Sequence, residues 1–211
     1  PKMNKQNYFD FNFDKIELDE NFYINSSNAD AYKGIIIENH KNVILHGPKK
    51  SGKSFLGNIW VKKYNGIKYS DNFNLIISSN KNILIDNIDK NFNEEKLFHI
   101  INHCNLNKLS ILIIPNFYYI ENNFSLKDLT SRLKIFTKFN INLPDDDMLL
   151  NILTKLLIDK QFVINSHEIF DFIIKRANRS YEEMFILVNK LDQLSLEKKR
   201  QLTIPLIKEI L

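Results

Sequence analysis

Residues 47 to 54 carry the residue types and the spacing that hold the phosphates of a nucleotide. They read Gly-Pro-Lys-Lys-Ser-Gly-Lys-Ser, which satisfies the pattern G-x-x-x-x-G-K-[ST]. In such a loop the backbone N–H groups turn onto the β-phosphate at the N-terminus of the following helix. Lys53 can reach the β- and γ-phosphates, and the Ser54 hydroxyl can hold Mg²⁺. Because a strand-like run precedes the loop and a helical run follows it, the pattern predicts a nucleotide site and disfavours a chance match.

A carboxylate follows further along the chain, at the end of a buried run. Residues 82 to 85 read Asn-Ile-Leu-Ile, and Asp86 and Asn87 come next. A buried parallel strand ending there puts Asp86 beside the phosphate loop, where it can hold magnesium through water. The alternative is an Asp that only caps a turn, and its coupling to the loop disfavours that reading. The amide of Asn87 cannot accept a proton, so we expect slow intrinsic hydrolysis.

Two arginines are candidates to complete a phosphate site. Arg132 lies between the last strand-like run and the C-terminal helices, where an arginine can project toward a neighbouring subunit's γ-phosphate. Taken alone, such an arginine is more often part of a surface salt bridge. Arg179 begins a helical segment and would face the nucleotide if the C-terminal helices close over it. A solvated position at the start of that helix is an equal alternative for Arg179.

Alternating strands and helices must position these residues. Short apolar runs are predicted to be buried parallel strands at residues 43–45, 75–78, 82–85 and 110–114. Caps and apolar spacing predict helices over residues 29–39, 54–64 and 94–104. This alternation predicts a parallel sheet with helices on both faces.

After Pro144 the pattern changes to helices alone. Helices are predicted over residues 145–160, 166–177, 181–196 and 203–211. The expected organisation is therefore an extended arm over residues 1–20, an α/β nucleotide-binding domain over 21–143, and a small helical domain over 144–211.

Composition and charge exclude several other classes of protein. Hydrophobic residues make up 44% of the chain, which is enough for a core, and the net charge of +4 is not concentrated in a basic block. The single cysteine, Cys104, excludes a disulfide framework and suits a reducing cytosol. The longest uncharged apolar run, residues 109–120, is too short for a membrane helix. Residues 1–14 lack a secretory signal. We expect a cytoplasmic protein without a membrane anchor.

The motifs, in this order, resemble the AAA+ domain of the DnaA replication-initiator family. The resemblance rests on Phe-Tyr-Ile-Asn-Ser-Ser-Asn at 22–28, the phosphate loop, Ile-Leu-Ile-Asp-Asn-Ile-Asp at 83–89 and Leu-Thr-Ser-Arg-Leu at 129–133. It spans essentially the whole chain and is greatest to the Hda group of DnaA-related regulators, because of the Asp86–Asn87 pair and the closing segment 202–211. The resemblance implies a P-loop AAA+ three-layer α/β domain followed by a small all-α lid.

The resemblance also implies roles for individual residues. Arg132 is implied to be an arginine finger acting in trans, and Asn87 and Asn116 take the other catalytic positions. Ser54 and Asp86 are implied to hold Mg²⁺. The residues implied to contact ADP or ATP are Gly47, Pro48, Lys49, Lys50, Ser51, Gly52, Lys53, Ser54, Phe55, Tyr23, Ile24 and Arg179.

Two positions depart from the family pattern. Asn116 stands close to the place where the family commonly carries a Thr or Ser sensor. The family's second sensor, an arginine on the lid, aligns with Glu182 or Glu183, and Arg179, one turn earlier, is the nearest replacement. Together with Asn87, these departures predict a protein that holds its nucleotide rather than a fast ATPase.

The N-terminal arm resembles the short peptides that dock into the replicative sliding clamp. Phe9 and Phe11 can insert into an apolar groove, while Gln6 sets the register by hydrogen bonds. Without the family context, an arm that packs its aromatic residues on its own domain is an equal alternative.

The implied function is regulation of replication initiation. The protein would bind an adenine nucleotide and the sliding clamp (the β subunit of DNA polymerase III), and would stimulate hydrolysis of DnaA-bound ATP to prevent re-initiation. DNA contact would come mainly through the clamp, because the chain has no residues beyond 211 to build the DNA-binding domain of DnaA. The alternative is a DnaA-related loading or recruitment factor without a role in hydrolysis. The sequence leaves open whether copies of the chain form a homo-oligomer.

Overall fold

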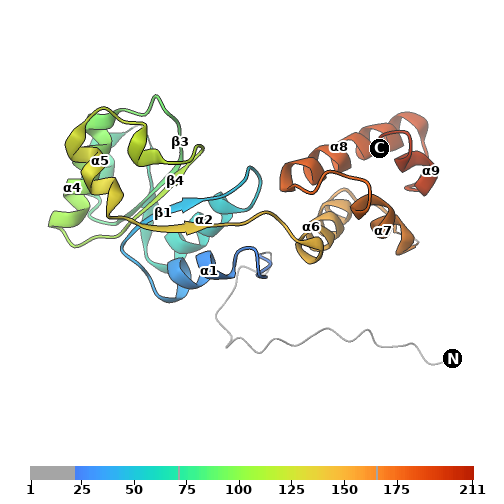
Figure 1. The fold of residues 1–211 in the computed structure, drawn as a ribbon, viewed down its shortest axis with the longest axis horizontal. Coiled ribbons are helices and arrows are strands. Elements are labelled where there is room, and N and C mark those ends of the chain that lie inside the picture. Colours follow the sequence, from blue (N-terminus) through green and yellow to red (C-terminus); the bar gives the residue numbers. More distant parts are fainter. Residues whose placement is uncertain (1–21, 71, 165) are drawn as a thin grey trace.

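The structure is a computed structural model that describes residues 22–70, 72–164 and 166–211. An α/β part is followed by a helical part, and one connecting segment joins the last strand to the first helix of the helical part (Figure 1). The predicted arm over residues 1–20, with its candidate clamp-binding residues Gln6, Phe9 and Phe11, lies outside the described residues.

The described residues of the α/β part contain a five-stranded sheet in the order β2-β3-β4-β1-β5. Every pair of neighbouring strands is parallel. The central strands are fully buried over most of their length because helices cover both faces, which is why they read as continuous aliphatic runs. The strands are β1 (Asn42–His46), β2 (Gly66–Lys68), β3 (Asn82–Ile88), β4 (Ile111–Pro115) and β5 (Thr137–Asn140).

The sheet packs against a layer of helices on each of its two faces, and each layer has its own hydrophobic cluster. One cluster joins the sheet to α3, α4 and α5, and the other joins it to α1, η1 and α2. The predicted three-layer α/β fold is thereby confirmed. The elements are α1 (Ala29–Tyr32), the π-helix η1 (Lys33–Ile37), α2 (Lys53–Lys63), α3 (Phe73–Ser78), α4 (Glu94–Leu106), the 3₁₀ turn η2 (Ile120–Asn122) and α5 (Lys127–Lys134).

The helical part has a core of its own. Leu153, Leu157, Ile173 and Leu191, each completely buried, are at its centre. No strand lies among the described residues after β5, as predicted. The helices are α6 (Asp146–Asp159), α7 (Glu168–Ile174), α8 (Tyr181–Lys198) and α9 (Ile204–Ile207).

The prediction of a buried strand over residues 75–78 is wrong, because this run belongs to helix α3. The Asn72 side chain accepts a hydrogen bond from the Leu75 backbone N–H at 3.1 Å and caps the helix. Leu75 is 53% exposed whereas Ile76 is buried, so the run has a helical face rather than two buried faces. A short apolar run does not distinguish the two states by itself. The edge strands β2 and β5 were not predicted, because they are short and mostly polar or exposed.

Hydrogen bonds join the two parts where the chain passes from β5 into α6. The Asp145 carboxylate caps α6 by accepting from the Met148 N–H at 2.8 Å. It also accepts from Ser26 Oγ at 2.6 Å and from Asn25 Nδ2 at 2.8 Å. One side chain therefore binds the first turn of the lid to the segment that precedes α1.

Replacing Asp145 by alanine should destabilise the protein. The change removes a helix cap and two side-chain hydrogen bonds, so we expect a loss of about 1–2 kcal/mol in the free energy of unfolding. Urea denaturation followed by circular dichroism measures this loss. The matched control is Asp146→Ala at the exposed neighbouring position, for which we expect less than about 0.5 kcal/mol. Equal losses in the two variants would contradict the role given to Asp145.

Candidate functional site

The loop over residues 47–54 connects β1 to α2 in a conformation that depends on its second glycine. Gly52 has a φ of +89° immediately before the first residue of α2, and a side chain there would be strained. Lys53 lies at the N-terminus of α2 and donates from its Nζ to the carbonyl oxygens of Gly47 at 2.8 Å and Pro48 at 2.7 Å. Burial lowers the pKa of Lys53, while Asp86 acts against that shift. The Lys53 ammonium group therefore lies inside the loop, where its hydrogen-bond partners are uncharged carbonyl oxygens.

The Ser51 hydroxyl lies inside the same loop and lacks a partner. Ser51 is 6% exposed, and its Oγ is buried with no hydrogen-bond partner among the described residues. An unpaired buried hydroxyl costs free energy unless a ligand or a water satisfies it. This orphaned group fits a loop that encloses an anion such as a phosphate.

A cavity of about 420 Å³ lies over the loop. From the α/β part, it is lined by loop residues together with Asp86, Asn87 and Asn116. These three side chains meet there because β3 and β4 are parallel neighbours that end at the same edge of the sheet. Glu182, at the start of α8, also lines the cavity, and its carboxylate is 3.7 Å from Lys49 Nζ. The aligned Glu182 position therefore presents a carboxylate where the family pattern has an arginine.

A second cavity, of about 330 Å³, lies on the other side of the loop. Lys50 lines both cavities, which places them next to each other. Aromatic and aliphatic side chains from three parts of the chain line much of the second cavity, beside polar residues that include Lys155 and Asp159. The apolar part of this lining is suited to a flat ring. The side chains are Phe22 and Tyr23 before α1, Phe55 on α2, and Met148, Ile152, Tyr181 and Phe185 from the lid.

Tyr23 connects this second cavity to the lid. Its hydroxyl donates to Asp147 Oδ2 at 2.7 Å, and this hydrogen bond raises the pKa of Tyr23 to about 12. Ile24, the other predicted residue of this segment, is not among the lining residues of either cavity and packs against the cluster under α1 and α2.

Asp86 is surrounded by polar groups at the base of the phosphate cavity. Ser54 Oγ donates to Asp86 Oδ1 at 3.1 Å, so the two residues predicted to hold magnesium lie together. Lys68 Nζ donates to the other oxygen, Oδ2, at 2.8 Å. Asp86 lies within β3, and a β-bulge at Asn87, with a φ of +61°, shifts the register of β3 against β4. Lys68 was missed because the strand that carries it, β2, was not predicted.

The two candidate arginines lie outside both cavities. Arg132 is on α5, half-buried, with its guanidinium 5.2 Å from the centre of the Phe98 ring. Arg179 forms an ion pair with Asp146 at the start of α6 instead of lining the phosphate cavity. In this arrangement neither arginine faces a nucleotide bound to its own chain.

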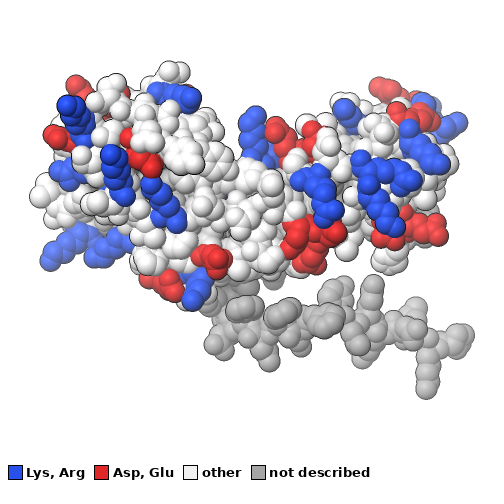
Figure 2. Space-filling view, viewed as in Figure 1, with Lys and Arg blue, Asp and Glu red and all other residues white. Residues whose placement is uncertain are grey.

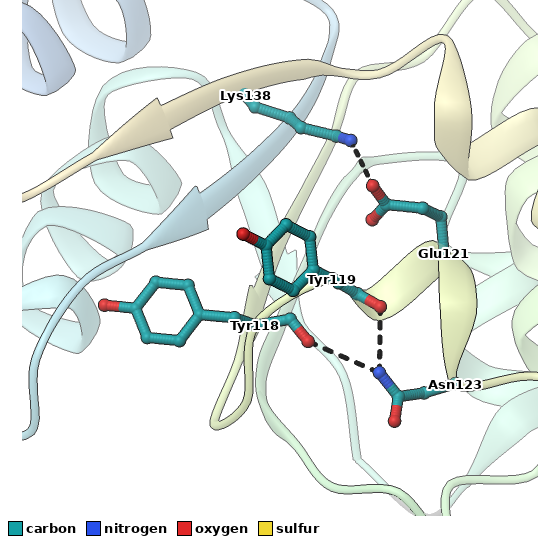
Figure 3. A network of polar contacts seen from close by, with 5 residues as sticks. All are labelled: Tyr118, Tyr119, Glu121, Asn123 and Lys138. Atoms are coloured by element: carbon teal, nitrogen blue, oxygen red, sulfur yellow. Dashed lines mark hydrogen bonds and ion pairs between the residues drawn. The ribbon is translucent and has the colours of Figure 1, made fainter.

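Sequence reasoning also missed a polar network beside the loop (Figure 3). Lys138 on β5 donates to Glu121 Oε1 at 2.5 Å, and Asn123 Nδ2 donates to the carbonyl oxygens of Tyr118 at 3.3 Å and Tyr119 at 2.8 Å. Tyr118, Tyr119, Glu121 and Lys138 line a third cavity of about 570 Å³. The buried His46 also lines it, with its ring stacked on that of Tyr118. The third cavity lies beside the phosphate loop and contains none of the predicted site residues except Pro48.

Comparison with known proteins assigns the helical part. Residues 146–211 match the family model described as the lid domain of Hda. The fold is that of domain III of the replication initiation protein DnaA from Thermotoga maritima, with a TM-score of 0.71, 16% identity, and coverage of 91% of this chain and 94% of that chain. The helical part is therefore an Hda-type lid, and the chain as a whole has the fold of DnaA domain III.

Other solved structures share this fold, and one curated protein matches part of the sequence. DnaA from Aquifex aeolicus, solved with AMPPCP, superposes with a TM-score of 0.63 at 20% identity, over 85% of this chain and 67% of that one. The RuvB branch migration motor of Thermotoga maritima superposes with a TM-score of 0.65 at 16% identity, over 88% and 68%. An uncharacterized protein from Haemophilus influenzae is 34% identical over 86 residues, which is 41% of this chain and 37% of that protein.

None of the described helices is long and apolar enough to cross a membrane. Within the described residues, no group of three or more His, Cys, Asp or Glu side chains is placed to hold a metal ion.

His46 should make the stability of the protein depend on pH. Burial lowers the pKa of His46; Glu121 acts against this shift, and Lys138 and Lys53 add to it. The unfolded chain then takes up a proton near pH 6.5 that folded His46 resists. The contribution to stability is therefore complete above about pH 6.5 and is lost as the pH falls toward the folded-state value, by up to about 1.4 kcal/mol per pH unit.

Urea denaturation at about pH 7.5, 6.5 and 5.5 measures this dependence. A His46→Gln variant, which cannot titrate, should lose less stability on acidification than the parent. His167→Gln, at an exposed position, is the matched control and should keep the slope of the parent. A slope unchanged in His46→Gln would contradict the assignment to His46.

Proposed function

We propose that the chain is a regulator of DNA replication initiation that binds an adenine nucleotide at the loop over residues 47–54. The supporting observation is the pair of adjoining cavities, one polar and over the loop, the other aromatic and beside it. An adenine ring would occupy the aromatic cavity, and the phosphates would displace the carbonyl partners of Lys53 and satisfy the Ser51 hydroxyl. The fold shared with AMPPCP-bound DnaA supports the same ligand class.

We infer that the chain holds its nucleotide and hydrolyses it slowly. Asn87 supplies an amide where a carboxylate would activate water, and its side chain carries no basic oxygen for a proton. Glu182 adds a negative charge to the phosphate cavity, which opposes the extra charge of a γ-phosphate. Both features favour a retained ADP over rapid turnover of ATP. Asn116 lines the cavity from the end of β4 and can donate to a phosphate oxygen.

The proposed output is hydrolysis of ATP on DnaA. Arg132 lies outside the cavities of its own chain, a placement that suits an arginine supplied in trans to a partner's γ-phosphate. The Gln6 to Phe11 segment would tether the regulator to the sliding clamp in the cytoplasm, and DNA would be reached mainly through that clamp. The charge distribution agrees with indirect DNA contact, because basic and acidic side chains are interspersed on the face seen in Figure 2.

Arg132→Ala should abolish the stimulation of DnaA-bound ATP hydrolysis. An arginine at the developing charge of phosphoryl transfer is worth about 10³-fold or more in rate. The assay follows release of phosphate from ATP-bound DnaA in the presence of clamp, DNA and the purified regulator. Lys134→Ala, an exposed change on the same helix, is the matched control and should stimulate like the parent. Full stimulation by a folded Arg132→Ala variant would rule out the finger role.

A recruitment factor without a role in hydrolysis is the second candidate, favoured by the packing of Arg132 on Phe98. In that case Arg132 stabilises α5 against α4 and is not held free for a partner. Measuring clamp binding together with the hydrolysis assay distinguishes the recruitment factor from the regulator.

The clamp interaction is predicted to depend on two aromatic residues of the arm. Phe9→Ala combined with Phe11→Ala should weaken binding to the clamp by at least about tenfold, because such anchors supply most of the energy in short docking peptides. Surface plasmon resonance on immobilised clamp measures the affinity. Phe13→Ala, just outside the motif, is the control and should bind like the parent. Binding unaffected by the double change would favour the recruitment factor.

A further inference from the structure

Lys68 occupies a position that brings a fixed positive charge to Asp86. Strands β2 and β3 are parallel, and Lys68 pairs with Leu84 in their register. Leu84 and Asp86 are two residues apart on β3 and therefore point to the same face of the sheet. Lys68 is thus the diagonal neighbour of Asp86, within reach of a long side chain. Its Nζ lies 2.8 Å from Asp86 Oδ2.

This contact changes how well the site suits a magnesium ion. Magnesium is held through oxygen atoms and keeps near-ideal octahedral geometry. Ser54 already donates to one oxygen of Asp86, and Lys68 donates to the other. The second carboxylate that lines the cavity, on Glu182, lies 3.7 Å from Lys49. Both oxygens of Asp86, the carboxylate at the base of the cavity, therefore already have a donor as partner.

The charge at Asp86 must still be neutralised when phosphates arrive. The Asp86 side chain is 6% exposed, so water screens it poorly. In a site without Lys68, a divalent cation would have to offset the repulsion between this carboxylate and the phosphates. The Lys68 side chain is half-exposed. Its ammonium group can therefore shift toward a bound phosphate while it stays in contact with water.

We propose that this site binds its adenine nucleotide without requiring a divalent cation, with Lys68 as the built-in counter-charge of Asp86. The proposal rests on the proposed nucleotide site and adds to it a specific role for a residue of an edge strand. Three lysines of the loop, Lys49, Lys50 and Lys53, also line the cavity. Their positive charges are enough to balance those of a diphosphate.

The test is a calorimetric titration of the full-length chain with ADP, once in excess MgCl₂ and once in excess EDTA. For the parent we expect affinities within about threefold of each other. For Lys68→Met we expect affinity about tenfold weaker in EDTA than in MgCl₂, because Asp86 then faces the phosphates without the positive charge of Lys68. Lys68→Arg keeps the charge and should behave like the parent.

Two further variants separate the charge of Asp86 from general effects. Lys68→Met combined with Asp86→Asn removes both charges and should again bind ADP equally with and without magnesium. Lys81→Met changes an exposed lysine at the start of β3, at the opposite edge of the sheet, and should match the parent. Thermal unfolding of each variant verifies that it is folded before titration.

The outcomes distinguish the inference from the function on which it rests. Magnesium-dependent ADP binding by the parent would overturn the inference while leaving the nucleotide site intact. A Lys68→Met protein that stays insensitive to EDTA, or a double variant that remains sensitive, would also overturn it. A folded parent that binds neither ADP nor ATP in either buffer would overturn the proposed nucleotide site itself.

Discussion

The site depends on one junction, where hydrogen bonds hold the lid against the segment before α1. Asp145 caps α6 and accepts from both Asn25 and Ser26, and Tyr23 donates to Asp147, two residues further on. The Tyr181 hydroxyl, at the start of α8, lies 3.2 Å from Ser27 Oγ, in a side chain that is only 1% exposed. These contacts bring two distant parts of the chain to opposite sides of the phosphate loop. The aromatic cavity exists only because both parts are held there.

Three side chains around the phosphate cavity bear on whether a bound triphosphate would be hydrolysed. Asn87 removes a carboxylate that would activate water, and Lys68 neutralises the carboxylate that remains at Asp86. Glu182 adds a negative charge on the lid side, opposite the loop lysines. Each change weakens the case for hydrolysis of a triphosphate and leaves the cationic loop available for a diphosphate. The proposed retention of a nucleotide rests on this arrangement.

Local signals were enough to predict the phosphate loop and its neighbours. The loop pattern required a strand before it and a helix after it, and β1 and α2 supply them. Asp86 and Asn116 could be placed beside the loop because parallel strands end at one edge of a sheet. Lys68 could not be found in this way, because β2 has only three residues and no buried apolar run. The ion pair of Arg179 with Asp146 depends on how the lid meets the sheet, which no local pattern encodes.

The proposed role of Arg132 in trans requires this arginine to lie away from a nucleotide bound to its own chain. Arg132 lies over Phe98 on the helix layer opposite α2, and neither cavity includes it. An arginine beside its own phosphates would accelerate hydrolysis of the bound nucleotide and defeat retention. Under the proposed function, this separation would let one nucleotide stay bound while Arg132 acts on another protein. A cation–π contact of this kind orients the side chain without consuming its hydrogen-bond donors.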